Sequence, residues 1–167
     1  KFIITETDEF LTSQGGLALI GMLAQRSGLH DRVSYVVGEK KNGSISTADA
    51  LLTMTGLLCL AKPDFDAVEQ FRDDDYFQQC LGLKNVPSEA TLRQRMDETG
   101  LIVRDEVLCA SATLLKKMAP KLTPCFKSYI PIDADVSVFD NSGSRKEGVS
   151  YTYKKFDGYA PMLAYIG

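Results

Sequence analysis

The chain has 167 residues, of which 44% are hydrophobic and 25% charged, and its formal net charge is −3. This composition is typical of a globular protein and excludes a disordered tail or a fibrous repeat. Because the net charge is slightly negative, any DNA contact must come from local basic patches. No apolar run approaches the roughly 20 residues of a membrane span, so we expect a soluble protein without a membrane partner.

The chain starts at Lys1, without an initiating Met or a leader, which suggests a trimmed sequence and gives no sign of secretion. Its four cysteines are Cys59, Cys80, Cys109 and Cys125. None is closely paired with another, as a zinc knuckle or redox motif requires, so we predict reduced core thiols and a cytoplasmic protein. His30 is the single histidine, which excludes histidine-rich metal sites.

Residues 1–122 are predicted to form an all-helical domain of five or six helices. Apolar residues recur at helical spacing over 13–27, and Gly28 is placed to end that helix. Thr47 can cap a helix that is apolar nearly all round and therefore belongs at the centre of the bundle. Lys62-Pro63 ends it.

The next helical segments are short. A helix around Phe65–Phe71 leads into the acidic run Asp73-Asp74-Asp75, which we interpret as the start of a helix rather than a metal site. Ser88 can cap the following helix, and Gly100 is predicted to end it. A last helix is predicted over 104–118.

Residues 123–167 change to a period of two. Apolar residues occupy every even position from Ile130 to Val138, and the alternation restarts from Val149 to Tyr153. Asp157-Gly158 is a tight-turn signal before a third strand over 160–166. The sequence therefore predicts an α+β protein, in which a helical domain precedes an antiparallel three-strand meander.

Asp133 and Asp135 should project from the same face of the first strand, with their Cα atoms about 6.6 Å apart. Two carboxylates on one patch can bind a hard divalent cation. They can also form the solvent-exposed face of a sheet, and the pattern alone favours that interpretation. Asp140 lies past the strand end in an ordinary turn.

Two groups of basic residues could contact DNA. Arg93 and Arg95 lie on either side of the Leu92/Met96 seam of a helix in the 65–100 region, which resembles a helix-turn-helix. Surface ion pairs with acids on the same helix are equally compatible. Lys154 and Lys155 lie beside tyrosines, either on a solvated hairpin edge or against a DNA backbone.

Several segments resemble, in order, the N-terminal half of bacterial insertion-sequence transposases of the DDE class (DDE group 1). The most specific motifs are Lys62-Pro63-Asp64-Phe65, Pro87-Ser88-Glu89-Ala90-Thr91 and Ile132-Asp133-Ala134-Asp135. The resembling segments cover nearly the whole chain and are residues 11–21, 56–74, 86–98 and 131–167.

The resemblance implies a helical region followed by a ribonuclease-H-like catalytic domain, whose first strand carries the first acid of an Asp-Asp-Glu triad. Asp135 is the preferred acid, because Ser137 fills a place that is often Ser or Thr in this family, and Asp133 is the alternative. The implied activity is DNA transposition by strand cleavage and strand transfer on double-stranded DNA, with Mg²⁺ or Mn²⁺ as cofactor.

The chain stops at Gly167, before the second Asp and the Glu of such a triad. We therefore expect this piece not to cleave insertion-end DNA. Unpaired strand edges and an uncovered apolar face predict a homodimer. Two other functions are compatible with the sequence: a non-catalytic helical DNA-binding or regulatory module, and a protein–protein assembly role.

Overall fold

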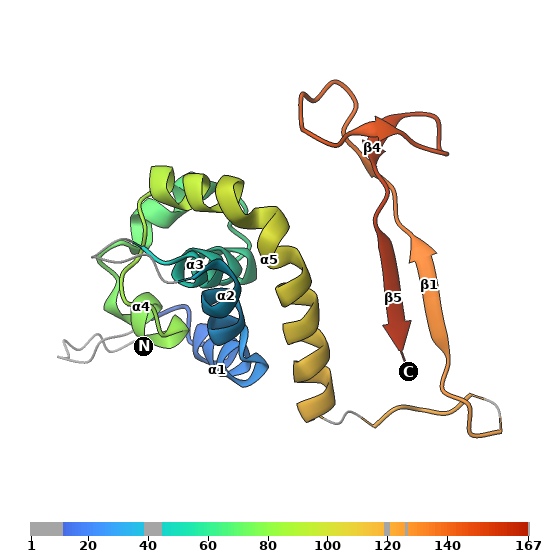
Figure 1. The fold of residues 1–167 in the computed structure, drawn as a ribbon, viewed down its shortest axis with the longest axis horizontal. Helices are drawn as coiled ribbons and strands as arrows, with labels where there is room; N and C mark the ends of the chain where they lie inside the picture. Colours follow the sequence, from blue (N-terminus) through green and yellow to red (C-terminus); the bar gives the residue numbers. More distant parts are fainter. Residues whose placement is uncertain (1–11, 39–44, 119–120, 126, 167) are drawn as a thin grey trace, which may run out of the picture. The chain divides into compact units, whose positions relative to one another are not determined.

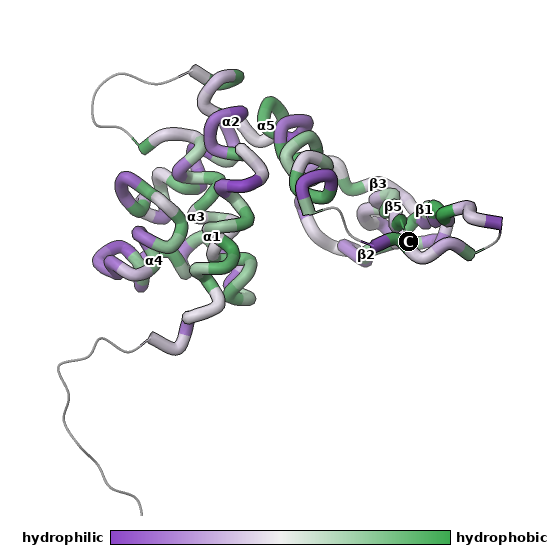
Figure 2. Tube along the Cα trace, turned by 90° about the horizontal axis from the view of Figure 1, so that it is seen from below, coloured by the Kyte–Doolittle hydropathy of each residue, from purple (hydrophilic) through white to green (hydrophobic). Residues whose placement is uncertain are grey.

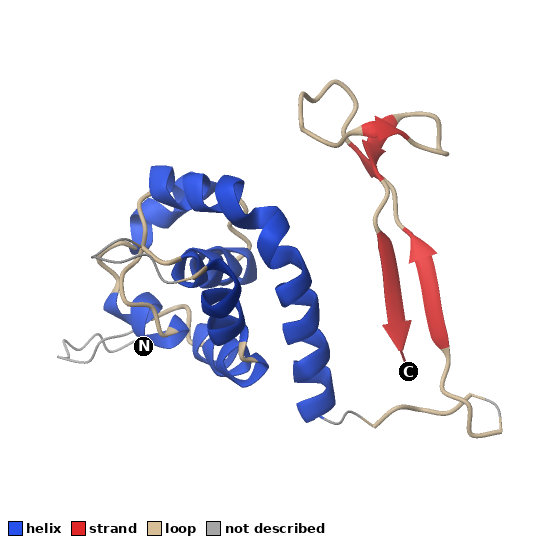
Figure 3. Cartoon of the chain, viewed as in Figure 1, coloured by secondary structure: helices blue, strands red, loops and turns tan. Residues whose placement is uncertain are grey.

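The computed structural model describes residues 12–38, 45–118, 121–125 and 127–166. The chain is mixed α and β, and it divides into two compact units, residues 1–119 and 120–167. The described helices all belong to the first unit, and the described strands to the second (Figure 3). The change of period in the sequence placed this boundary at residues 122–123.

The helical unit is built around one central helix (Figure 1). Its elements are α1 (Leu17–Ser27), α2 (Leu29–Val37), α3 (Thr47–Cys59), the 3-10 helix η1 (Phe65–Phe71), α4 (Asp75–Leu81) and α5 (Glu89–Met118). Helix α3 packs against all the others, which confirms its predicted central place. The hydrophobic parts of α1 and α3 lie side by side (Figure 2). Phe71 stacks on Phe77 in the core, with 4.5 Å between ring centroids.

Several predicted helix ends are confirmed by their hydrogen bonds. Gly28 ends α1 in the left-handed conformation, with φ of 70°. The Ser88 hydroxyl accepts from the Thr91 N–H at 3.3 Å at the start of α5. The carboxylate of Asp74 accepts from the Phe77 N–H at 3.0 Å, so the acidic run does begin a helix.

The predicted cap of α3 was wrong by one residue. The hydroxyl of Ser46, not that of Thr47, accepts the free N–H of Asp49 at 2.9 Å. Thr47 is already the first helical residue. An N-cap requires an extended backbone, which Ser46 has (φ −71°, ψ 156°).

Gly100 does not end a helix, because α5 continues through it to Met118. A glycine inside a helix costs only about 1 kcal/mol, and the burial of Val103 and Ala110 beyond it outweighs that cost. The helix bends midway (Figure 1). The Thr99 hydroxyl donates to the Arg95 carbonyl at 2.6 Å, a contact that bends helices.

Helices α1 and α4 approach each other closely at Gly21. A Cβ atom built on Gly21 would overlap the backbone carbonyl of Cys80 near the end of α4. Only glycine allows this contact, and the two helices pack extensively along their length.

The prediction that the cysteines are core residues was wrong for three of them. All four are free thiols, but Cys59, Cys109 and Cys125 are exposed. Cys80 is half-buried and packs against the core. The helical period shows which residues share a face of a helix, but not which face the core covers. Cys109 lies on the exposed side of α5.

The strand unit contains a two-stranded and a three-stranded sheet, both antiparallel, in the described residues. Strand β1 (Ile132–Val136) pairs with β5 (Met162–Ile166). In the other sheet β4 (Asp157–Tyr159) lies between β2 (Phe139–Asp140) and β3 (Ser150–Tyr151). The predicted meander is therefore corrected: the last strand returns beside the first, because pairing is decided by long-range contacts and not by the short connections between strands.

The turn at Asp157-Gly158 was also placed wrongly, since these residues lie inside β4. The hairpin instead turns through Tyr153, Lys154 and Lys155, where the Thr152 N–H donates to the Phe156 carbonyl at 2.9 Å. Lys155 has a positive φ of 66°, as the last residue of a three-residue hairpin loop requires. Gly158 is needed for a different reason: a Cβ there would overlap the carbonyl of Phe139.

Candidate functional site

The two acids of β1 share one face of the β1–β5 pair. Asp133 lies opposite Tyr165, and Asp135 lies opposite Leu163. The other face carries only aliphatic side chains, and its cross-strand pairs are Ile132 with Ile166, Ala134 with Ala164, and Val136 with Met162. The alternation of the sequence therefore produces an acidic face and an apolar face on one ribbon.

Both carboxylates are open to a ligand. Asp133 and Asp135 are exposed, and within the part of the chain that the structure describes neither carboxylate makes a hydrogen bond or ion pair. Their Cα atoms are two strand positions apart, about 6.6 Å. Among the described residues, no three His, Cys, Asp or Glu side chains lie close enough to hold a metal ion, so the pair has no third protein ligand there.

Asp140 is engaged in the turn that follows β2. Its carboxylate accepts from the Ser142 N–H at 2.8 Å. The hydroxyl and the N–H of Ser142 both stabilise the charged form, and together they lower the pKa of Asp140 below its usual value. This residue shapes the loop and does not extend the acid pair.

The structure brings the basic turn to the end of β1. The hydroxyl of Tyr153 donates to the carbonyl of Val136 at 3.3 Å. Val136 directly follows Asp135, and Lys154 and Lys155 directly follow Tyr153, so the acid pair and the lysines belong to adjoining parts of one unit. Both lysines are exposed. The sequence pattern does not predict the Tyr153 contact, because its two residues are 17 positions apart.

The two arginines of α5 have different surroundings. Arg95 is 11% exposed in its side chain, donates to the Ile45 carbonyl at 3.2 Å and pairs with Glu98 at 3.0 Å. Its guanidinium holds the start of α3 to α5, so we leave Arg95 out of the DNA surface. Arg93 is 53% exposed, pairs with Glu89 at 2.9 Å and lies over the ring of Phe65, 4.7 Å from its centroid.

The segment that resembled a helix-turn-helix contains η1, α4 and the first turns of α5. Helix α4 packs chiefly against α1, whereas η1 packs against α5. Glu69 of η1 reinforces this arrangement, because its carboxylate accepts from the Glu89 N–H at 2.7 Å. This hydrogen bond, followed by that from Arg72, lowers the pKa of Glu69.

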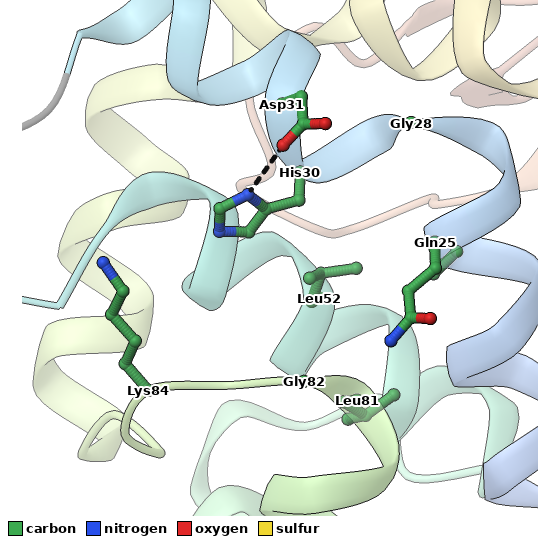
Figure 4. A pocket seen from close by; sticks show the side chains of 9 residues that line it. Gln25, Gly28, His30, Asp31, Leu52, Leu81, Gly82 and Lys84 are labelled. Carbon is green, nitrogen blue, oxygen red and sulfur yellow. Dashed lines mark ion pairs between the residues drawn. The ribbon is translucent and has the colours of Figure 1, made fainter.

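The helical unit also contains a cavity of about 370 Å³ between α1, α2, α3 and the end of α4 (Figure 4). His30 lines it with its Nδ1 3.5 Å from the Asp31 carboxylate, and Lys84 and Gln25 line other parts of it. Leu52 and Leu81 supply its apolar lining. The sequence does not predict this cavity, because its residues come from separate segments without a shared motif.

Comparisons of the chain with protein-family models, with curated proteins and with solved structures find no match. Within the described residues, no helix combines the length and the apolar character needed to cross a membrane.

Proposed function

We propose that the chain is part of a DDE-class insertion-sequence transposase, in which the strand unit begins a ribonuclease-H-like catalytic domain and the helical unit contacts DNA. The observation that carries this proposal is the placement of Asp133 and Asp135 on one exposed face of β1, paired with β5. The resemblance of the sequence assigns the first triad acid to this strand.

The donor set fits magnesium. Mg²⁺ is usually bound by one or two carboxylates together with water and substrate phosphates, and two exposed carboxylates on one face offer such a partial set. When bound, the metal would neutralise phosphate charge and lower the pKa of a nucleophilic water or hydroxyl. Asp135 is the principal ligand in this proposal, and Asp133 supports it from the same face.

The lysine turn would hold the DNA backbone next to this acid face. Lys154 and Lys155 are exposed at the tip of a hairpin that is tied to the end of β1 through Tyr153. Lysine side chains bind phosphates without reading sequence, so the turn would position the duplex rather than select it. Arg93 provides a second, separate contact from the helical unit.

Metal binding can be tested on the chain itself. Manganese, added at millimolar concentration to the ¹⁵N-labelled protein, should broaden the amide signals of β1 around Asp133 and Asp135. The Asp133→Asn/Asp135→Asn variant should lose this broadening, whereas the control Asp140→Asn, which removes another exposed acid of the same unit, should keep it. Equal broadening in all three proteins would refute the assignment of the metal site.

DNA binding is tested by fluorescence anisotropy with a labelled duplex over a range of salt concentrations. Each phosphate contact contributes about −0.9 to the slope of log K against log salt, so Lys154→Ala/Lys155→Ala should reduce the slope by about 2. The charge-matched control is Arg145→Ala/Lys146→Ala, in a loop of the same unit. An equal loss in both variants would show a general charge effect and refute the lysine turn as the contact.

A second candidate function is a non-catalytic DNA-binding or regulatory module. Arg93 favours it, because its side chain stays 53% exposed on α5 although it pairs with Glu89 and lies over the ring of Phe65, and an exposed arginine can contact DNA phosphates. This function is supported if Arg93→Ala weakens DNA binding while the Asp133→Asn/Asp135→Asn variant binds manganese and DNA as the unmodified chain does.

A further inference from the structure

The second half of α5 carries an apolar stripe that faces away from the helical core. Leu101, Leu108 and Leu115 are spaced seven residues apart and are 86%, 63% and 55% exposed. Asp105 and Ala112 fall between them and are also exposed. At about 100° per residue, all five positions lie within about 40° of one line along the helix.

The opposite side of the same helix is already occupied. Val103 and Ala110, about half a turn away from the stripe, are each 3% exposed. Arg32 of α2 donates to the Thr113 hydroxyl at 3.1 Å, and Lys117 donates to the Arg26 carbonyl at 2.7 Å. These contacts fix the rotation of α5, so the leucine stripe is held outward.

We propose that this stripe binds the same stripe of a second copy of the chain, with the two α5 helices antiparallel and Leu108 on the two-fold axis. The spacing is symmetric about Leu108, since Leu101 and Leu115 both lie seven residues from it. A two-fold axis there places Leu101 of each copy opposite Leu115 of the other. Self-complementarity of this kind is what an isologous dimer requires.

The charges select the antiparallel arrangement. In a parallel pair, each Asp105 would face Asp105 of the second copy, which places like charges in the seam. In the antiparallel pair, Asp105 lies opposite Ser111, next to the small side chain of Ala112, and away from the second Asp105. Lys116 and Lys117 of one copy then lie opposite Gly100 and Thr99 of the other, within one turn of the acidic side chain of Asp97. The two helix dipoles also oppose each other favourably.

This interface is distinct from the strand-edge dimer that the sequence predicted, and it requires neither DNA nor a metal. It involves only the helical unit. Its test can therefore fail or succeed independently of the proposed transposase role.

Cysteine cross-linking tests the register. In a background of Cys80→Ala with the three exposed cysteines changed to serine, Leu108→Cys should form an interchain disulfide under mild oxidation, because its two copies meet at the axis. Leu101→Cys alone should not, since its two copies would be about 21 Å apart. Leu101→Cys combined with Leu115→Cys should cross-link again. Efficient cross-linking of Leu101→Cys alone would overturn the antiparallel register.

Sedimentation equilibrium tests the dimer without cysteines. Leu108→Glu should raise the dissociation constant at least tenfold with an unchanged circular dichroism spectrum, because Leu108 is exposed within one chain. The matched control is Leu19→Glu on α1, whose side chain is equally exposed at 63%. Asp105→Ala should tighten the dimer by removing charge from the seam. A chain that is monomeric at about 100 μM, or an equal loss of dimer in Leu19→Glu, would overturn the proposal.

Discussion

Replacing Gly21 by alanine should destabilise the helical unit, although alanine is the better helix former. Alanine gains about 1 kcal/mol of helix propensity over glycine. Its Cβ would overlap the backbone carbonyl of Cys80, which has no rotamer by which to move away. Overpacking of this kind costs about 3 kcal/mol. The expected net loss is therefore about 2 kcal/mol of unfolding free energy.

The matched control is the same substitution at Gly100, which also lies inside a helix but where a Cβ meets nothing within 4 Å. Gly100→Ala should therefore stabilise the unit by about 1 kcal/mol. Urea unfolding followed by circular dichroism at 222 nm measures both variants, and a loss of about 2 kcal/mol lowers the midpoint by about 1 M. The close packing of α1 on α4 is refuted if Gly21→Ala is as stable as the unmodified chain.

Three further predictions concern single contacts. Glu69→Gln should lower the urea midpoint near pH 7, because the carboxylate binds the N–H at the start of α5. Since the pKa of Glu69 is lowered on folding, this stabilisation exists above its usual value of 4.5 and disappears as the pH falls through the folded pKa, so the two midpoints should converge in acid. Ala61→Gly should raise the unfolding free energy by about 1 kcal/mol, because Ala61 follows α3 with φ of 58°, and an unchanged or lower midpoint contradicts this. Gly158→Ala should open the β2–β4 pair at the Phe139 carbonyl, seen as faster amide exchange of Asn141, whose N–H donates to Asp157 across that pair.

The local signals of the sequence predicted the helical unit well. Gly28 and Ser88 mark helix ends through their own backbone and side-chain hydrogen bonds, which depend on residues only a few positions away. The prediction that Gly100 ends a helix was wrong because distant contacts outweighed a local preference. The local preference of Gly100 to end a helix is weak, and the burial of Val103 and Ala110 in the core, which involves distant residues, determines that α5 continues.

The strand unit shows where sequence reasoning reaches its limit. The alternation around Asp133 and Asp135 predicted both the strand and the shared face of the two acids, because that face follows from the period of two. The partner of this strand could not be predicted, since β5 begins 26 residues after Val136 in the sequence. The contact of Tyr153 with Val136, which brings the lysine turn to the strand end, is also long-range and was missed for the same reason.

At Lys155 the residue that the backbone conformation favours differs from the residue that the sequence carries. With φ of 66°, this residue adopts a left-handed conformation that glycine or asparagine adopts at lower free energy. A hairpin shaped for stability alone would carry one of those residues at its tip. Glycine in place of Lys155 would relieve the backbone but remove one cation of the lysine turn, so under the proposed function this turn is a place where gains in rigidity and gains in affinity for an anionic partner oppose each other.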